Sequence, residues 1–316
     1  MMKKKIFIPR FLLMFISFLL ISQSYGQNKK NLAEKLGYPK DAKLLIIHAD
    51  DAGVSHAEDM ATITAFKNGD ITSSSIMVPC PWFPEIAAYA KSHPKLDFGI
   101  HITLTSEWKN YRWQGISPYN SIPSLIDKKG YFYPSEKDVA NYANPIEVEK
   151  EVRAQIKRAI SFGVNITHLD SHMGSIFQTP ELFKVYLKLG REFKLPVFIP
   201  RNMINQYPEL KKMIPLETIL VDNLYMMSDG VNSKNWFKAY KKMIESMPPG
   251  LNELIVHLAF ANDEMKAITS EHPNFGATWR QRDYNFITSS NFKKLLKDNS
   301  IILVNWSQIK RLSYPN

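Results

Sequence analysis

The sequence has almost no cysteine: Cys80 is the single one among 316 residues. An internal disulfide is therefore excluded, and a chain of this size must be held together by its hydrophobic core. The position after Val78-Pro79 predicts that Cys80 is a small, buried apolar side chain. The sequence also lacks a cluster of Lys and Arg interleaved with aromatic residues and any nucleic-acid-binding motif, so nucleic acid is not expected as a partner.

Internal repeats, low-complexity runs and Gly/Ser-rich linkers are missing too, which indicates a single domain. Neither sign of charge dominates, since the chain has 40 Lys and Arg residues and 30 Asp and Glu residues. This mildly basic balance favours solubility and, at most, a weak attraction to anionic surfaces.

The first 26 residues have the features of a secretory signal peptide. Basic residues 3–5 and Arg10 precede an apolar segment, residues 11–22, and Ser24 and Gly26 supply small residues for cleavage. The apolar segment is shorter than the ~20 residues that a membrane helix needs. We therefore expect cleavage after residue 26, a mature protein of residues 27–316 in the periplasm or extracellular space, and no stable membrane anchor. An uncleaved anchor is the alternative.

Strand-like and helix-like segments alternate along the rest of the chain. Apolar runs predict strands at residues 43–49, 73–78, 98–103, 166–169, 197–199, 254–256 and 301–304. Amphipathic spacing predicts helices at residues 58–67, 86–90, 146–162, 181–193, 236–247 and 292–298. Such alternation predicts an α/β fold with right-handed parallel crossovers. A closed or nearly closed barrel of seven strands is favoured over an open sheet, because candidate site residues follow several different strands.

The first predicted strand stops at two adjacent carboxylates, Asp50 and Asp51, followed by Ala52-Gly53. The carboxyl end of a buried parallel strand is where α/β folds place their chemistry. Because the adjacent side chains are expected to diverge where the strand ends, one could hold a cation while the other handles a proton. A turn rich in Asp and Gly after a core strand is the alternative that the pair alone leaves open.

Two further predicted strands carry candidate metal ligands. His101 lies within the third strand, and His168, Asp170 and His172 share one face of the fourth if that segment is extended. Imidazole and carboxylate groups are the usual ligands of a catalytic divalent metal. Taken alone, His101 could be a buried core histidine, and the group of His168, Asp170 and His172 could be the polar end of a strand. Their joint occurrence with the carboxylate pair, all at strand ends, favours a metal site.

Four ordered motifs resemble those of the YdjC-like carbohydrate deacetylases. They are ADDAG at residues 49–53, NGDITSSS at 68–75 with Met77, GIHITLT at 99–105 and THLDSH at 167–172, and the resemblance extends from about residue 42 to residue 306. It implies a distorted (β/α) TIM-like barrel and metal-dependent hydrolysis of N-acetyl groups on amino sugars such as chitooligosaccharides. The implied partner is an acetylated carbohydrate, whose sugar, chain length and acetyl position, N-linked or O-linked, the sequence does not specify.

By this resemblance, Asp51, His101 and His172 hold the metal, and Asp50 accepts a proton from the water bound to it. A divalent cation lowers the pKa of its water towards ~7 and polarises the acetyl carbonyl. One ion is expected, because Met173-Gly174 stands where many family members have further histidines. Two imidazoles with one carboxylate suit Zn²⁺, while Mg²⁺, Co²⁺ and Mn²⁺ are the alternatives.

Three more residues receive roles from the same resemblance. Asp170 and His168 are expected behind the ligands, because a ligand imidazole usually donates its second N–H to a carboxylate or carbonyl. His168 is equally well explained as a core histidine. The family has a late strand ending in His-Pro-Gly, and residues 254–259 keep its histidine, His257, but not Pro-Gly. His257 is the candidate donor of a proton to the leaving amine, since an imidazole with a pKa of ~6.5 exchanges protons near neutrality.

Candidate substrate contacts lie outside these motifs. Residues 105–144 interrupt the alternation with aromatic and turn-forming residues, and such a long irregular stretch in a compact domain is usually functional. Trp108 and Trp113 in this stretch could stack on sugar rings, or could instead fix the loop to the barrel. Arg201 follows the strand predicted at residues 197–199 and is a further candidate for the pocket.

Two other functions remain open. A metal-free glycoside hydrolase on a similar barrel would use Asp50 and Asp170 as its acid and nucleophile, about 5 to 9 Å apart across the sugar. A non-catalytic carbohydrate-binding barrel is the second alternative, which the changed sequence after His257 makes conceivable. The sequence does not distinguish a monomer from a homodimer.

Overall fold

The computed structural model describes residues 30–315, so the predicted signal peptide lies outside the described part of the chain. The strands are β1 (Lys43–Ala52), β2 (Ser73–Ile76), β3 (Phe98–Ile102), β4 (Ile166–Ser171), β5 (Asn223–Met226), β6 (Gly250–His257) and β7 (Ile301–Leu303). They pair in parallel within one seven-stranded sheet, in the order β4-β3-β2-β1-β6-β5 with β7 on β1. The predicted α/β, barrel-like fold of a single domain is confirmed.

An irregular segment, residues 196–200, lies between β4 and the chain that leads into β5. On one side, Phe198 N–H donates to the carbonyl of Leu169 on β4 (2.8 Å), and on the other, Val221 N–H donates to the carbonyl of Ile199 (3.1 Å). The barrel is therefore closed through isolated bridges and is distorted at this point. The strand predicted at residues 197–199 forms only these bridges. The regular fifth strand is β5, whose half-exposed residues form no apolar run.

β1 is the longest strand and pairs with two strands along one edge. β7 pairs with residues 43–45 of β1, and β2 pairs with β1 from His48 onwards. Along the opposite edge, residues 43–50 of β1 pair with β6, so that Asp50 lies opposite His257. At its carboxyl end β1 is thus flanked by β2 and β6, and this end carries the aspartate pair.

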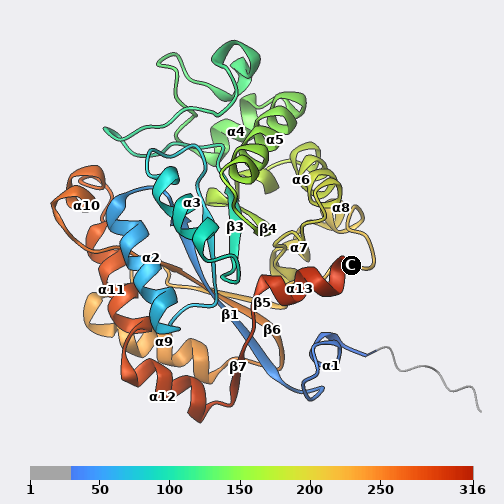
Figure 1. Cartoon of the computed structure of the whole chain (residues 1–316), viewed down its shortest axis with the longest axis vertical. Coiled ribbons are helices and arrows are strands. Elements are labelled where there is room, and N and C mark those ends of the chain that lie inside the picture. Colours follow the sequence, from blue (N-terminus) through green and yellow to red (C-terminus); the bar gives the residue numbers. More distant parts are fainter. Residues whose placement is uncertain (1–29, 316) are drawn as a thin grey trace, which may run out of the picture.

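The helices lie outside the strands, with α2, α9, α11 and α12 gathered on one side and α5, α6 and α8 on the other (Figure 1). The six predicted helices are present as α2 (His56–Asn68), α3 (Phe83–Ser92), α5 (Pro145–Ser161), α6 (Pro180–Glu192), α9 (Trp236–Glu245) and α12 (Ser290–Asp298). Further α-helices are α1 (Leu32–Lys35), α4 (Glu136–Tyr142), α7 (Arg201–Ile204), α8 (Pro208–Lys211), α10 (Asp263–Ile268), α11 (Ala277–Ile287) and α13 (Trp306–Ser313). Short 3₁₀ helices are η1 (Tyr119–Ser121), η2 (Pro123–Leu125), η3 (His172–Phe177) and η4 (Ser233–Asn235).

Local sequence explains where α2 starts and stops. The Ser55 side chain accepts a hydrogen bond from the N–H of Glu58 (3.1 Å), which caps the first turn. Gly69 ends the helix with a φ of 70°, a left-handed conformation that glycine adopts without strain. Among residues 30–315, no helix is both long and apolar enough to cross a membrane.

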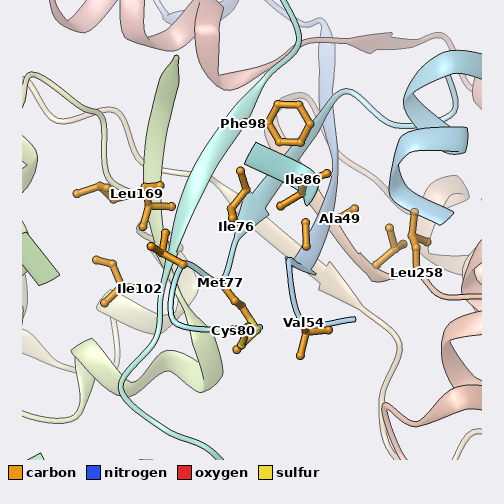
Figure 2. Packing of buried hydrophobic residues seen from close by; sticks show 14 of the residues in the cluster. Ala49, Val54, Ile76, Met77, Cys80, Ile86, Phe98, Ile102, Leu169 and Leu258 are labelled. Atoms are coloured by element: carbon orange, nitrogen blue, oxygen red, sulfur yellow. The ribbon is translucent and has the colours of Figure 1, made fainter. Parts of the chain in front are cut away.

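The main core fills the space between strands and helices. Figure 2 shows Ala49 of β1, Ile76 of β2 and Phe98 of β3 facing Ile86 of α3. Cys80 is buried in the same cluster, as predicted. Burial raises the pKa of its thiol well above the usual value, so this side chain behaves as an apolar filler.

The inner face of the barrel changes from apolar to polar along β1. Leu44 and Ile46 belong to a small cluster at the amino end, and His48 and Asp50 follow at the same two-residue spacing. On the neighbouring strands β3 and β4, the ring of His168 lies so close to Gly99 that a Cβ at position 99 would be 2.4 Å from the imidazole. Only glycine fits there, because the buried imidazole takes the space of a side chain.

Candidate functional site

Three potential metal ligands meet at the carboxyl end of the barrel. Asp51 lies near the end of β1, His101 in β3, and His172 directly after β4 at the start of η3. Asp51 Oδ1 is 3.3 Å from His101 Nε2 and 3.2 Å from His172 Nδ1. All three side chains are buried, and one ligand atom of each lies within 4.8 Å of the others. The structure thus brings together the three residues that the resemblance implies as ligands, here called the triad.

The backbone at the end of β1 turns both aspartates towards the triad. Asp51 has a φ of 67°, in the left-handed region that Asp tolerates better than most residues. This conformation interrupts the alternation of side chains along the strand. As a result, Asp50 Oδ2 and Asp51 Oδ2 lie 3.9 Å and 4.0 Å from the same atom, Nε2 of His257. The two side chains therefore diverge less than expected, although each has contacts of its own.

The donor atoms of the triad suit a divalent cation. Within the described residues, the buried Asp51 Oδ1 accepts no hydrogen bond. The outer ring nitrogens of both imidazoles are engaged: His101 Nδ1 lies 2.9 Å from Asp170 Oδ1, and His172 Nε2 lies 3.1 Å from Glu107 Oε2. When each imidazole gives its outer proton to a carboxylate, the inner nitrogen presents its lone pair. One carboxylate oxygen and two imidazole nitrogens then face a common point, as in catalytic sites with an open position.

The charges around the triad favour a positive group at its centre. Burial disfavours a charged imidazole, yet Glu107 and Asp51 raise the pKa of His172 to about 9. Burial would likewise raise the pKa of Asp51, but Arg280 and the two imidazoles hold it well below its usual range. Asp51 is therefore ionised, and the surrounding carboxylates stabilise positive charge where a cation would bind.

Arg280 of α11 fixes the orientation of Asp51. Its Nη2 donates to Asp51 Oδ2 (2.7 Å) and its Nη1 to Glu58 Oε2 (2.8 Å), and all three side chains are buried. This contact occupies Oδ2 and leaves Oδ1 for the triad. Because Arg280 is 229 residues away from Asp51 in the chain, no sequence spacing pairs the two.

Replacing Arg280 with Met is expected to lower the free energy of unfolding by about 3–5 kcal/mol, because the change leaves buried carboxylates without their partner. The matched control is Arg201→Met, which breaks an exposed ion pair with Asp222 (2.9 Å) and should cost about 1 kcal/mol or less. Urea unfolding of both variants after chelator treatment measures the difference without a contribution from bound metal. Equal losses in the two variants would contradict the role given to Arg280.

His257 lies beside the triad on β6. Its backbone N–H donates to Asp283 Oδ2 (3.2 Å), and its ring packs edge-on against Phe275, with centroids 5.0 Å apart. Its parallel pairing opposite Asp50 does not depend on the missing Pro-Gly. Burial lowers the pKa of His257 to about 4, so the imidazole is neutral near pH 7. A neutral imidazole at this position can accept a proton and pass it on.

Asp170 and His168 lie at different distances from the triad. Asp170 lies behind the triad, with Oδ1 bound to His101 and Oδ2 3.0 Å from His48 Nε2. His168 lies two residues further from the carboxyl end of β4, where its Nδ1 meets Thr167 Oγ1 (2.9 Å) and its ring stacks on Trp306. Asp170 thus orients a ligand imidazole, whereas the hydrogen bond and stacking of His168 are those of a core histidine.

A cavity of about 660 Å³ opens above the triad. Asp50, the triad and His257 line its floor. Apolar side chains from β5, β6, η3, α7 and the segment after β4 also line the cavity, and they include Phe177, Phe198, Met203, Leu224 and Ile255. A partly apolar cleft with a few convergent polar groups is typical of a small-molecule site.

The sequence profile of the YdjC-like protein family matches residues 44–298. The chain belongs to the YdjC-like family. The carbohydrate deacetylase of Thermoanaerobacter pseudethanolicus is 29% identical over 271 residues, which cover 85% of this chain and 100% of the relative. The carbohydrate deacetylase of Thermus thermophilus is 30% identical over 274 residues, 85% of this chain and 94% of the relative. A crystal structure from Enterococcus faecalis, described provisionally as a cellobiose-phosphate cleavage protein, has a TM-score of 0.71 and 26% identity, covering 85% of this chain and 99% of that one.

Of the substrate contacts predicted for this YdjC-like chain, only Trp108 lines the cavity. Trp113 packs behind His172, with ring centroids 6.3 Å apart, and its Nε1 donates to the carbonyl of Thr105 (2.8 Å). Arg201 extends towards solvent, where it pairs with Asp222. Trp113 therefore fixes the loop, as the alternative held, and the structure places Arg201 away from the cavity.

Three residues at the site are not predicted from the sequence as contacts of the triad or of Asp50. On sequence grounds Glu107 is a candidate contact for substrate hydroxyls, Arg280 is a candidate for a polar contact or a structural ion pair, and His48 has no role. The first two reach the triad through tertiary contacts between distant segments, which no local pattern reveals. His48 could have been found from strand periodicity, because it lies two residues before Asp50 on β1 and therefore faces the same side.

Proposed function

We propose that this chain hydrolyses the acetyl group of an acetylated amino sugar and uses one divalent cation held by Asp51, His101 and His172. The observation that carries the proposal is the buried triad at the floor of the cavity, with Asp51 Oδ1 free of hydrogen bonds within the described residues. Family membership and the carbohydrate deacetylase relatives support deacetylation of a carbohydrate.

The residues around the triad provide the proton transfers that amide hydrolysis needs. A bound divalent cation supplies a Lewis acid, which acidifies water and polarises a carbonyl. Asp50 turns Oδ2 towards the cavity floor, 3.9 Å from Nε2 of both His101 and His257, and is placed to accept the proton of the attacking water. His257, neutral at rest, takes this proton from Asp50, whose Oδ2 lies 3.9 Å from its Nε2, and gives it to the leaving amine. The products are acetate and a free amino sugar.

The geometry disfavours a glycoside hydrolase that uses Asp50 and Asp170. Both oxygens of Asp170 are occupied, one by His101 and one by His48, and the side chain does not line the cavity. A nucleophile or acid must reach the sugar from the opposite side to its partner. Here both carboxylates bind the same imidazole, His48, so they cannot flank a substrate.

Acetate release tests the proposal directly. Purified protein is incubated with N-acetylated chitooligosaccharides, and acetate, free amine and new reducing ends are measured. We expect acetate and amine in equal amounts, loss of activity after chelation, and recovery with Zn²⁺, Mg²⁺, Co²⁺ or Mn²⁺, the most effective of which identifies the metal. Reducing ends without acetate would indicate a glycoside hydrolase, and tight sugar binding without any product would indicate a binding protein.

Two further points belong to the proposal. We propose that the mature enzyme starts at Gln27 and works outside the cytoplasm, on the basis of the basic and apolar pattern in residues 1–26. We also propose one ion per chain, since His101 and His172 are the imidazoles of the triad and Met173-Gly174 adds no ligand type that suits a second ion.

A further inference from the structure

His48 is a fully buried imidazole at the junction of two functional carboxylates. It lies on β1, and its Nε2 is 3.1 Å from Asp50 Oδ1 and 3.0 Å from Asp170 Oδ2. Asp50 is the proposed acceptor of the water proton, and Asp170 binds the ligand His101. His48 itself does not line the cavity. It therefore touches both groups from behind, without access to substrate.

We propose that His48 is a positioning residue: a buried imidazolium that holds Asp50 and Asp170 in their working orientations at the same time. The inference rests on the proposed function for the roles of these two carboxylates. The charge and contacts of His48 follow from the geometry alone and stand independently of the reaction.

The contacts of both ring nitrogens of His48 favour a proton on each of them. Nδ1 lies 2.9 Å from Ser73 Oγ, and this hydroxyl donates its own proton to Asp97 Oδ1 (2.7 Å). Ser73 Oγ must then accept from Nδ1–H. On the other side, Nε2 lies 3.1 Å and 3.0 Å from two carboxylate oxygens and 3.0 Å from Ser75 Oγ. An unprotonated nitrogen would point its lone pair at two anionic acceptors, so the geometry favours a proton on Nε2 as well.

The surroundings of the ring supply the charge that an imidazolium needs. Asp50 on β1 and Asp170 on β4 are the close carboxylates, and Glu253 on β6 lies 4.0 Å from Nδ1. The neutral neighbours are Ser73 and Ser75 on β2 and His168 on β4, whose ring meets that of His48 edge-on at 5.1 Å. A buried positive charge between two carboxylates satisfies all three groups, which no neutral side chain would do.

One side chain thereby controls two parts of the site. Asp50 Oδ1 lies at ion-pair distance from His48 Nε2 (3.1 Å), and Oδ2 is directed at the cavity floor, towards Nε2 of His101 and of His257. Because Asp170 Oδ2 is held by the same nitrogen, Oδ1 stays on His101 Nδ1. That bond keeps the proton of His101 on its outer nitrogen and leaves Nε2 for the metal.

A second metal site is the competing explanation for this cluster. His48, His168 and Asp170 also offer ligand atoms within 4.8 Å of one another. However, both nitrogens of His48 serve as donors to Ser73 and the carboxylates, and His168 Nδ1 is bonded to Thr167. The buried His168 Nε2 has no hydrogen-bond partner among the described residues, but a cation bound to His48 would have to displace a proton from that ring.

The test uses metal-loaded enzyme and two variants of His48. His48→Gln keeps a neutral N–H near the Nε2 position, and His48→Leu removes both donors. We expect His48→Gln to keep its metal and KM while kcat falls about 10-fold to 100-fold, and His48→Leu to fall further. Ile46→Val, a core change two residues earlier on β1, controls for lost stability and should keep the kcat of the parent.

The protonation state gives a readout that a merely structural role would not move. In ¹⁵N NMR of histidine-labelled, metal-loaded enzyme, one imidazole should have both ring nitrogens protonated at neutral and mildly alkaline pH, and this signal should disappear in His48→Gln. An unprotonated nitrogen on His48, or an unchanged kcat in metal-loaded His48→Gln, would each overturn the inference. If the parent enzyme releases no acetate, the proposed function fails, while the NMR result still decides the charge of His48.

Discussion

Asp50→Asn is expected to bind its divalent cation like the parent and to lose about 10²- to 10⁴-fold in kcat, the usual contribution of a general base. The amide keeps the shape of the carboxylate and its contact with His48, but cannot accept a proton from water. Asp50 Oδ1 faces away from the triad, and Oδ2 is 3.9 Å from His101 Nε2, so the side chain is not needed to hold the ion.

The matched variant is Asp51→Asn, the same change one residue later. Asp51 Oδ1 belongs to the triad, so this variant should bind metal more weakly and regain part of its activity when metal is added. Excess metal should not rescue Asp50→Asn. Equal loss of metal in both variants would mean that the two carboxylates are joint ligands, and His257 would then be the first candidate for the base.

The roles of the aspartates depend on features that a sequence shows only in part. The apolar run that ends at Asp50 and Asp51 correctly predicted β1 and the position of both carboxylates, because a buried parallel strand has a clear signature and a defined functional end. The left-handed backbone of Asp51 was not predictable from that run, since strand periodicity assumes a regular strand.

Ligands could be predicted from sequence, but the groups behind them could not. His101 and His172 stand at strand ends, where their chemistry is conspicuous. Glu107 lies in a loop without periodicity and reaches His172 only through the fold. Arg280 lies on α11, a helix that buries Arg280 and Asp283 alongside its apolar residues, which obscures the amphipathic pattern used to predict helices.

The same limitation applies to β5. It has four residues, three of them half-buried and Met226 exposed, so it has neither the continuous apolar run of a central strand nor strict alternation. The segment at residues 197–199 does have an apolar run and is buried, but it forms only isolated bridges. The apolar run at residues 197–199 therefore reflects burial. Which segment forms a regular strand depends on hydrogen-bond pairing, which the local sequence does not encode.

The second large effect concerns the triad itself. Replacing His101 or His172 with Ala removes one of the three ligand residues and is expected to weaken metal binding by more than about 10²-fold. The loss of a group that only orients a ligand typically weakens binding by about 10- to 100-fold. Activity should fall with metal content. His93→Ala is the matched control, because His93 is an exposed imidazole directly after α3 whose ring, within residues 30–315, is hydrogen-bonded to Tyr89 and Ser92 of that helix.

The most direct measurement is the metal stoichiometry of the parent, His101→Ala, His172→Ala and His93→Ala, determined by elemental analysis after equilibrium dialysis against the activating metal. Circular dichroism of the same samples establishes that each variant is folded. We predict one ion per chain in the parent and in His93→Ala, and almost none in the two triad variants. Retention of one ion per chain by folded His101→Ala or His172→Ala would contradict the assignment of the triad as the metal site.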